Sequence, residues 1–503
     1  MDLKWLMPKA QHGQLLGSQS HSEPASGKSN PDILVNTIQR LVNNPVSKLF
    51  LKSVSSDCKK CGKRLDLILR KYSGEKVRLC RSCRFHYTVG SFVITNAAKA
   101  FGLSEKEMKA TFSDPVMRRG LTNVIKGIAI YGMTKPQITY APFMVVWDWT
   151  HWCNLKCKHC YISAGSKLEN ELTTEEAKNL IDDLEEAGVV ALSFAGGEPL
   201  MRKDFFEVAG YAKKKGLYVT VATNGTLITK EVARKLKETV DYVEVSVDGA
   251  NAVTHDAFRG IPGVFEHTMQ GIRNSVEAGN YTCMATTVNR TNLDEAEEIY
   301  QLAKELGVKM LIFFNFIPSG RGKDNINLDL TPEERERFLD FVYSKMSSGS
   351  RPYVCSTAPQ LGRVCMNNGS SIPTHFFSQD MVGKYTELCE FVGGCGAGRL
   401  YCSIEPTGDV QPCVFMPIKV GNIRETPLEQ IWHNSEILEK LRDRSKLKGH
   451  CGECENKFVC GGCRARAYGY FGDLDAPDVG CINNSAYWES MNRPLMTVQV
   501  KSR

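Results

Sequence analysis

Short apolar runs recur at regular intervals through the middle of the chain, with helical periodicity between them. Six runs have the length and the β-branched and aromatic content of buried strands: 144–150, 191–197, 218–225, 242–249, 282–289 and 310–317. Between the first two of these runs, Thr173 and Glu176 have capping-box spacing and Gly188 suits a helix end. Strands that alternate with helices predict a parallel sheet. Six units are fewer than the eight of a closed barrel, so we expect an α/β fold built on an open, partial (β/α)6 barrel.

Polar and glycine residues gather where these strands end. Function in such sheets lies at the carboxyl ends of the strands. The residues concerned are Thr150, Gly196, Gly197, Asn224, Gly225, Asp248, Gly249 and Asn289.

The chain on either side of the barrel divides by composition. We expect an N-terminal tail over 1–57 that contains one amphipathic helix from Ile33, and a cysteine-rich and helical region over 58–140. The barrel covers 141–330, an insert or linker with turn signals covers 331–388, and a second cysteine-rich segment covers 389–484, followed by a tail over 485–503. The stretch 115–133 is basic at one end and otherwise apolar. Packing within its own domain is the favoured interpretation, with a membrane interface or a tunnel wall as the alternatives.

Composition excludes several classes of protein. The 503 residues are 42% hydrophobic and 24% charged, as in folded proteins of two to four domains. No apolar run approaches the ~18 residues of a spanning helix, and the start of the chain lacks the pattern of a secretory signal. We therefore expect a cytoplasmic protein, in which the 19 cysteines serve metal ligation rather than disulfides.

Charge is uneven along the chain. Residues 1–140 carry 23 Lys and Arg against 9 Asp and Glu, although the whole chain has a net charge of only +7. A basic N-terminal third favours an anionic partner, and peripheral association with an anionic membrane is one form of it. A solubilising face around a metal site is an equally good explanation.

The first cysteine group consists of two close pairs, Cys58 with Cys61 and Cys80 with Cys83. Each C-x2-C pair presents two sulfurs from one tight turn, and two pairs complete a tetrahedral site for one metal. Zinc and a rubredoxin-like iron both take four thiolates, so the metal stays open. A closed site of four ligands leaves no position for substrate, which favours a structural role.

The second group is Cys153, Cys157 and Cys160, which follow the first predicted strand. Three cysteines within eight residues can hold three irons of a [4Fe–4S] cluster and leave the fourth iron open to a small molecule, whereas electron-transfer clusters take four cysteines. Zinc would need a further ligand. Gly196-Gly197-Glu198-Pro199 follows the second strand, where glycines allow close approach of a ligand and the carboxylate can hold an amino group.

These two motifs together resemble the radical S-adenosylmethionine (SAM) superfamily over about residues 140–320. The resemblance implies that the open iron binds SAM, and that one electron from a ferredoxin- or flavodoxin-type donor yields methionine and a 5′-deoxyadenosyl radical that removes a hydrogen atom from a substrate. It also implies SAM contacts from residues at matching positions: His159 near the adenine, Gly196, Gly197 and Glu198 at the amino group, and Ser246, Asp248 and Asn289 at the ribose or carboxylate. For Ser246 and Asp248, a strand-end turn is nearly as good an explanation.

The C-terminal cysteines resemble the SPASM domain, which holds auxiliary [4Fe–4S] clusters. By this resemblance, one cluster is held by Cys451, Cys454, Cys460 and Cys481. The other is held by Cys395, Cys413 and Cys463, with Cys402 as the preferred fourth ligand and Cys389 as the alternative. The final gap is x2 here rather than the commoner x3. With the SAM-binding cluster, three [4Fe–4S] clusters are expected. Cys283 is expected to be a buried apolar residue. Cys355 and Cys365 lie in the insert, near the expected substrate entrance; ordinary loop thiols are the favoured interpretation and a radical or acid partner is the alternative.

The substrate is the least constrained point. The N-terminal four-cysteine site resembles the mononuclear thiolate site of archaeal tetraether lipid synthases. The first hypothesis is therefore that the substrate is a lipid or isoprenoid chain and the reaction is C–C bond formation. The segments CGAGRLYCSIEPTGDVQPC and CGGCRARA resemble enzymes that decarboxylate haem precursors, which makes a tetrapyrrole the second. A peptide- or protein-modifying maturase is a third. In a different class, the chain would be a non-catalytic iron–sulfur or zinc protein that binds nucleic acid. No aromatic–basic interleaving of an RNA-binding module supports this, so we expect no nucleic-acid partner.

Overall fold

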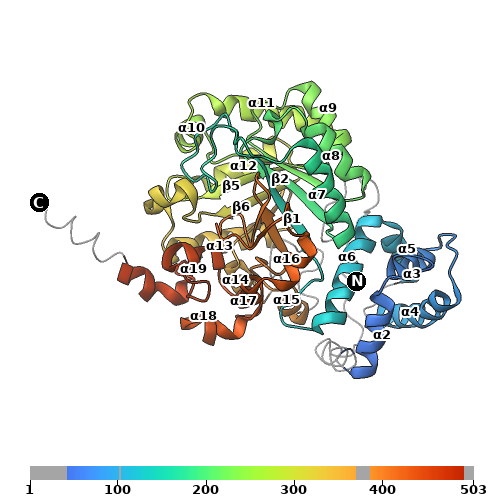
Figure 1. Ribbon diagram of the computed structural model, residues 1–503. Helices are drawn as coiled ribbons and strands as arrows, with labels where there is room; N and C mark the ends of the chain where they lie inside the picture. Colours follow the sequence, from blue (N-terminus) through green and yellow to red (C-terminus); the bar gives the residue numbers. More distant parts are fainter. Residues whose placement is uncertain (1–41, 43, 101–103, 370–385, 492–503) are drawn as a thin grey trace, which may run out of the picture.

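The computed structural model describes residues 42, 44–100, 104–369 and 386–491 (Figure 1). The predicted helix from Ile33 lies outside these ranges.

A single sheet organises the molecule, and all six predicted strands are present in it. Its strand order is β10-β9-β8-β1-β2-β3-β4-β5-β6-β7, with parallel pairing from β8 through β7. The strands are β1 (Met144–Thr150), β2 (Ala191–Gly196), β3 (Tyr218–Thr223), β4 (Tyr242–Ser246), β5 (Thr282–Val288), β6 (Met310–Asn315), β7 (Tyr353–Ser356), β8 (Tyr401–Ile404), β9 (Asp409–Gln411) and β10 (Gly421–Asn422).

Segments outside the predicted barrel lengthen the sheet at both edges. Strand β7 comes from the expected insert and pairs with β6, and β8 comes from the second cysteine-rich segment and pairs with β1. In the β1–β8 pair, Met144 lies opposite Tyr401 and Val145 lies opposite Cys402. The C-terminal segment is therefore joined to the barrel wall through backbone hydrogen bonds.

Helices connect the strands and cover the outer face of the sheet (Figure 1). The sequence signals of α7 hold in the structure: Thr173 and Glu176 form a capping box, and Gly188 ends the helix with a φ of 90°. The helices of the barrel and C-terminal segment are α7 (Thr174–Ala187), α8 (Phe205–Lys214), α9 (Lys230–Thr239), α10 (Ala252–Arg259), α11 (Val264–Glu277), α12 (Ala296–Glu305), α13 (Pro332–Ser347), α14 (Gln360–Asn367), α15 (Thr386–Val392), α16 (Leu428–Asn434), α17 (Glu436–Arg442), α18 (Gly449–Glu453) and α19 (Arg464–Phe471). Short 3-10 helices are η2 (Pro199–Met201), η3 (Leu293–Glu295), η4 (Gly320–Leu328), η6 (Arg444–Lys446) and η7 (Ile482–Asn484).

Five helices precede the barrel and form a unit with its own small core. They are α2 (Pro45–Ser55), α3 (Arg64–Ser73), α4 (Arg81–Ala100), α5 (Glu105–Ser113) and α6 (Pro115–Tyr131). Residues such as Val54, Leu69 and Phe112 pack together in that core. Helix α2 therefore belongs to this packed unit, although its residues fall in the range that the sequence assigned to a tail.

Helix α6 attaches the unit to the barrel. A side chain at Gly127 would lie 2.5 Å from the Ile138 carbonyl, so the helix approaches the chain there as closely as only glycine permits. The Asn123 amide donates to the carbonyls of Ala141 and Gly188, near the amino ends of β1 and β2. The apolar stretch 115–133 thus packs within the protein, as favoured from sequence.

None of the described helices combines the length and the apolar character needed to cross a bilayer.

Candidate functional site

A cavity of about 430 Å³ occupies the inside of the barrel. Two cysteine groups from distant parts of the sequence line it: Cys153, Cys157 and Cys160 from the loop after β1, and Cys395, Cys413 and Cys463 from the C-terminal segment. The lining near the amino ends of the strands is mainly apolar and comprises Phe143, Met144, Ala191, Tyr218, Tyr242 and Met310. One space is therefore bordered by both candidate cluster sites.

The loop that carries Cys153, Cys157 and Cys160 is held by its own backbone and by Arg321. The Cys153 amide donates to the Gly165 carbonyl, and the Arg321 guanidinium donates to the carbonyls of Cys157 and Ala164. Arg321 follows β6, the last of the six predicted barrel strands, whereas the cysteine loop follows β1, the first. The segments after the first and the last of these strands therefore meet at this loop. No motif in the sequence pointed to Arg321.

The three sulfurs fit an iron–sulfur cluster better than a single ion. Among the described residues, only the N-terminal four-cysteine group places three or more candidate ligand atoms all within 4.8 Å of one another, so these three sulfurs are spread more widely. Burial raises the pKa of the Cys153 thiol to about 12, so a thiolate here needs a cationic metal centre beside it. The donor set and its spacing therefore suit a multi-iron cluster.

The two glycines after β2 are required by the cluster loop itself. A side chain on Gly197 would meet the Trp152 carbonyl oxygen at 2.2 Å, and one on Gly196 would meet the Thr150 carbonyl oxygen at 2.7 Å. Both glycines line the cavity. The close approach that these glycines permit is therefore, in the first place, that of the loop backbone to the end of β2.

Glu198 joins the ends of β2 and β3. Its buried carboxylate accepts hydrogen bonds from the Thr223 hydroxyl at 2.7 Å, the Asn224 amide at 2.8 Å and the Leu200 amide at 3.2 Å. Both oxygens have partners within the chain, and Glu198 is not among the cavity-lining residues, whereas Thr223 and Asn224 are. A direct contact between Glu198 and SAM stays a prediction.

Asp248 lies behind the cavity wall and pairs with Arg259, which no motif in the sequence marked. One carboxylate oxygen of this buried side chain lies 2.7 Å from Nε of Arg259, and the other accepts from the Thr287 amide at 2.7 Å. Arg259 lines the cavity and its Nη1 lies 3.7 Å from the Cys157 sulfur. Asp248 thus orients a cation at the cluster loop.

His159, Ser246 and Asn289 have different placements. His159 lines the cavity and stacks on Phe258 with a 4.3 Å separation of ring centroids, and burial lowers its pKa well below 6.5, so the ring is neutral. Ser246 also lines the cavity. The Asn289 side chain instead accepts from the Thr291 amide and hydroxyl in a local turn. His159 and Ser246 are therefore open to a ligand, and Asn289 supports the loop after β5.

The C-terminal cysteines separate into two sets. Cys395, Cys413 and Cys463 share a small packed cluster at the cavity, and the Tyr401 hydroxyl donates to the Cys413 sulfur at 3.0 Å. Cys451 lies near Cys454, Cys460 and Cys481: burial is the first cause that raises the pKa of each of these three thiols, and the charge of Cys451 raises it further. The interleaved ligation expected from the sequence stays a prediction.

Cys402 does not join the first set. Strand β8 turns Tyr401 toward the cavity, and the next residue, Cys402, faces the opposite side and packs in the main apolar core with Val145 and Trp432. This placement does not support Cys402 as the fourth ligand, and the identity of that ligand stays a prediction. Cys389, the alternative, is buried in α15 and is absent from the cavity lining.

A tyrosine and an aspartate connect the two cysteine groups at the cavity. The Tyr161 hydroxyl donates to Oδ1 of Asp148 at 2.6 Å, and the Tyr161 ring packs edge-on against Phe415, 5.3 Å away. Tyr161 directly follows Cys160, and Phe415 comes two residues after Cys413. Burial raises the pKa of Asp148 to about 7. The position after a ligand cysteine was the only sequence signal for Tyr161.

Glu244 is a second residue that the sequence did not suggest. It lies on β4 and lines the cavity, and no hydrogen bond or ion pair links its carboxylate to any described residue. Burial raises its pKa to about 7. The only lysine or arginine residues of the described lining are Arg259 and Arg321, both already engaged at the cluster loop. A substrate therefore meets an unbalanced carboxyl group here.

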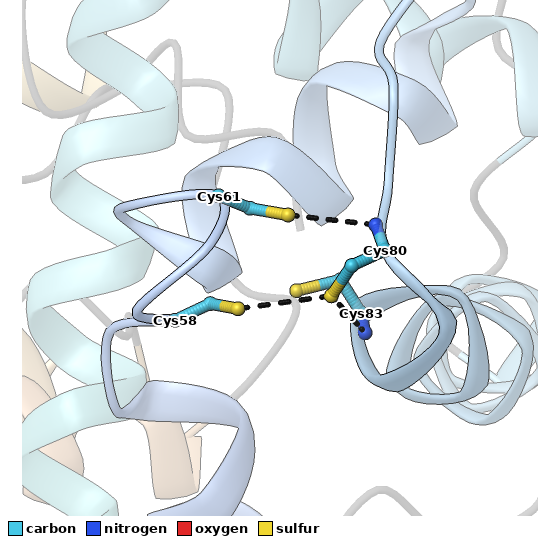
Figure 2. Close-up of side chains that lie close together, drawn as sticks. All are labelled: Cys58, Cys61, Cys80 and Cys83. Carbon is cyan, nitrogen blue, oxygen red and sulfur yellow. Dashed lines mark hydrogen bonds between the residues drawn. The ribbon is translucent and has the colours of Figure 1, made fainter.

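The N-terminal cysteines form a compact group (Figure 2). Cys58, Cys61, Cys80 and Cys83 place their sulfurs within 4.8 Å of one another, with Cys58 and Cys80 at 3.7 Å. The two turns face each other, and the Lys60 amide is the largest cause that lowers the pKa of Cys58, to about 6. The expected four-thiolate site is confirmed as a geometric group, and it suits zinc or iron.

The remaining cysteines are buried. Cys283 and Cys355 lie in an apolar cluster between β5 and β7, and Cys365 lies in the main core. Cys355 and Cys365 are therefore not loop thiols at an entrance: the insert folds into a strand and a helix that bury them.

Family models match the two cysteine-bearing segments of the barrel and the C-terminal region. The radical SAM superfamily model matches residues 147–303, and the iron–sulfur cluster-binding SPASM domain matches residues 395–455.

Known proteins resemble the chain at the level of sequence and of fold. An AdoMet-dependent heme synthase of Methanosarcina barkeri is 40% identical over 353 residues, which is 69% of this chain and 97% of that protein. Mycofactocin maturase MftC of Mycolicibacterium smegmatis is 35% identical over 351 residues, 68% of this chain and 83% of that protein. Streptococcus suis SuiB, solved with S-adenosylmethionine, has a TM-score of 0.59 at 15% identity and covers 80% of this chain and 90% of its own. SuiB supports the fold alone.

These matches join the motif geometry to a family of enzymes and remove the non-catalytic interpretation. The superfamily uses SAM and a [4Fe–4S] cluster, and the SPASM domain implies auxiliary clusters. The chain belongs to the radical SAM superfamily, as an enzyme with a SPASM domain and an additional four-cysteine group near its N-terminus.

Proposed function

We propose that this enzyme cleaves SAM reductively and oxidises a tetrapyrrole side chain held in the barrel cavity, in the manner of an oxidative decarboxylation. The observation that carries the proposal is the cavity itself, which both cysteine groups line. A substrate between them has a radical source on one side and an electron acceptor on the other. When bound, SAM and its cluster supply a 5′-deoxyadenosyl radical that can remove a hydrogen atom.

The residues of the chain divide into contacts and supports in this proposal. Gly196, Gly197, His159 and Ser246 line the cavity and are proposed to contact SAM. Glu198, Asp248 and Asn289 act through their neighbours: Glu198 fixes Thr223 and Asn224, and Asp248 fixes Arg259. The buried pair of Asp248 and Arg259 keeps a positive charge beside the thiolates without leaving it unpaired.

Three [4Fe–4S] clusters are proposed, one at each cysteine set of the barrel and C-terminal segment. Cys153, Cys157 and Cys160 hold the SAM-binding cluster, and Cys451, Cys454, Cys460 and Cys481 hold the outer auxiliary cluster. Cys395, Cys413 and Cys463 hold the auxiliary cluster at the cavity. The N-terminal group holds one zinc or iron. A low-potential donor of the ferredoxin or flavodoxin type supplies the electron for each turnover.

A tetrapyrrole replaces a lipid as the first substrate hypothesis. The heme synthase relative matches over 97% of its length at 40% identity, and none of the relatives reported above has a name related to lipids. The apolar lining near the amino ends of the strands suits a flat, hydrophobic ring system.

A peptide is the second candidate, and Glu244 favours it. A tetrapyrrole with several carboxylates would meet an unbalanced carboxyl group in a cavity whose two arginines are already engaged. A peptide offers amide and amino donors to that group instead. The 35% identity to a mycofactocin maturase supports the same candidate.

Anaerobic incubation with SAM, dithionite and iron coproporphyrin III, followed by mass spectrometry, tests the proposal. The expected product has lost carbon dioxide and two hydrogens from a propionate. Cys413→Ala should abolish this product and still allow 5′-deoxyadenosine to form. Unchanged porphyrin beside abundant 5′-deoxyadenosine would remove the tetrapyrrole and direct the search to peptides.

A further inference from the structure

The N-terminal helical unit lies outside both family models, which begin at residue 147 and end at residue 455. The heme synthase relative is matched over 97% of its length by only 69% of this chain. Neither family model therefore accounts for this unit. Its surface offers two features that point to a partner.

The first feature is the outward face of α4. Its inner face, with Cys83, His86 and Gly90, packs toward the unit. Arg81, Phe85, Thr88 and Phe92 follow one another at helical spacing on the opposite face, and all four are exposed. The exposed fractions of Phe85 and Phe92 are 63% and 71%, and Val93 beside them is 55% exposed. Large aromatic side chains aligned on a solvent face indicate an interaction surface.

The second feature is positive charge at the start of the same helix. The four-cysteine group brings the turn after Cys58 against the first turn of α4 (Figure 2). Six basic residues of these two turns and of the segment that leads into α4 are exposed, and none forms an ion pair with a described residue: Lys59, Lys60, Lys76, Arg78, Arg81 and Arg84. In the described stretch 44–100, basic residues outnumber acidic ones, as they do over the whole N-terminal third.

The location of this surface argues against docking of the electron donor. Helix α6 attaches the unit at the amino ends of β1 and β2, through Asn123 and Gly127. The SAM-binding cysteines follow the carboxyl end of β1, and a strand of seven residues separates the two ends by about 20 Å. A donor on α4 would therefore be far from the cluster that it must reduce.

We propose that the outward face of α4, with the basic turns at its start, binds an anionic membrane surface. Phe85 and Phe92 enter the boundary between head groups and acyl chains, and the arginines and lysines contact lipid phosphates. A membrane interface was one alternative for the stretch that forms α6. Because α6 is packed against the barrel, we assign the membrane-binding face to α4 instead. The proposal is independent of the substrate.

Flotation of the full-length, metal-loaded protein with vesicles tests it. The protein should float with vesicles of phosphatidylglycerol and phosphatidylcholine, and not with phosphatidylcholine alone. Phe85→Ser with Phe92→Ser should weaken binding at least about tenfold. Arg81→Gln with Arg84→Gln should weaken it by about tenfold to thirtyfold, whereas Arg81→Lys with Arg84→Lys should retain it.

Val253→Ser is the matched control, since Val253 is 81% exposed on α10 of the barrel. It should float like the parent protein, and metal content and thermal unfolding should be unchanged in every variant. Absence of flotation with anionic vesicles, or flotation that ignores the α4 substitutions, overturns the proposal. Binding of poly-uridylate in place of vesicles makes the partner a nucleic acid and overturns it. Vesicle binding only after removal of residues 1–41 assigns the face to that segment and also overturns it.

Discussion

Nη1 of Arg259 lies 3.7 Å from Sγ of Cys157, although 102 positions separate the two residues in the chain. Nε of the same arginine lies 2.7 Å from the Asp248 carboxylate. The backbone strengthens the link, because the Lys156 amide donates to the Arg259 carbonyl. The end of α10 therefore holds the loop that carries Cys153, Cys157 and Cys160, and it places a fixed positive charge beside one of the loop's sulfurs.

Replacement of Arg259 tests this arrangement. In Arg259→Gln, Asp248 becomes a buried carboxylate without its cation, so we expect the free energy of unfolding to fall by about 3 kcal/mol. The reduction potential of the SAM-binding cluster should also fall, because a positive charge near the thiolates is lost. Denaturant unfolding and redox titration followed by electron paramagnetic resonance measure the two effects.

The double variant Arg259→Gln with Asp248→Asn is the control for Arg259. It should regain much of the lost stability and keep the lowered potential. An unchanged potential in both variants would show that Arg259 has only a structural role.

Iron content distinguishes Cys402 from Cys413. Cys402→Val should keep the parent's iron and lose less than about 1.5 kcal/mol, because an apolar residue of similar size replaces a buried thiol. Cys413→Ala should lose about four irons per chain. Loss of iron from Cys402→Val would reverse the assignment made from the orientation of β8.

Glu244 should give stability a pH dependence. Burial raises its pKa from 4.5 to about 7, so the fold favours the protonated form. Ionisation then costs stability as the pH rises from 4.5 to about 7, and the cost is constant at higher pH. Glu244→Gln cannot ionise and should gain up to about 3 kcal/mol over the parent protein at pH 8, with little gain at pH 4.5. Thermal unfolding across this range measures the difference.

The matched substitution for this prediction is Glu238→Gln, at an exposed position of α9. It should show no such trend. If the difference in stability between Glu244→Gln and the parent protein stays constant from pH 4.5 to pH 8, a cation balances the Glu244 carboxylate in the protein in solution, and the prediction is wrong.

Removal of one N-terminal ligand should affect that unit alone. In Cys61→Ser we expect about one metal fewer per chain, together with loosened packing of α3 and α4, because a structural metal stabilises the turns that bind it. Elemental analysis of the parent protein identifies the metal as zinc or iron. We expect the variant to be cleaved by proteases within residues 44–131 while its iron–sulfur cluster content stays unchanged. A Cys61→Ser variant that keeps its full metal content would contradict a metal site at the four cysteines.

The sequence predicted what depends on local spacing. The six barrel strands, the α7 capping box and the cysteine spacings all arise within short stretches, where periodicity and ligand geometry are sufficient. The roles of individual residues in these motifs were predicted less well when their hydrogen-bond or ion-pair partners lay far away in the sequence. Asp248 was recognised as a polar strand-end residue, but its partner Arg259 belongs to α10, and nothing in local spacing connects them.

Cys402 shows a second limit. Spacing placed it between Cys395 and Cys413, but only the pairing of β8 with β1 decides that Tyr401 faces the cavity and Cys402 the core. Strand β8 has four residues, too few for its alternation to be evident from sequence. Glu244 escaped notice for a related reason, since a carboxylate in a strand is informative only once the strand is known to face a cavity.

Formation of 5′-deoxyadenosine is the direct test of reductive SAM cleavage by this chain. The chain is loaded with iron and sulfide under anaerobic conditions, given SAM and dithionite, and analysed by mass spectrometry. We expect 5′-deoxyadenosine from the parent protein, continued formation in Cys413→Ala, and none in Cys153→Ala with Cys157→Ala. Absence of 5′-deoxyadenosine from a chain that iron analysis shows to be loaded, with iron coproporphyrin III or peptide present, or equal formation in the variant that lacks Cys153 and Cys157, would contradict it.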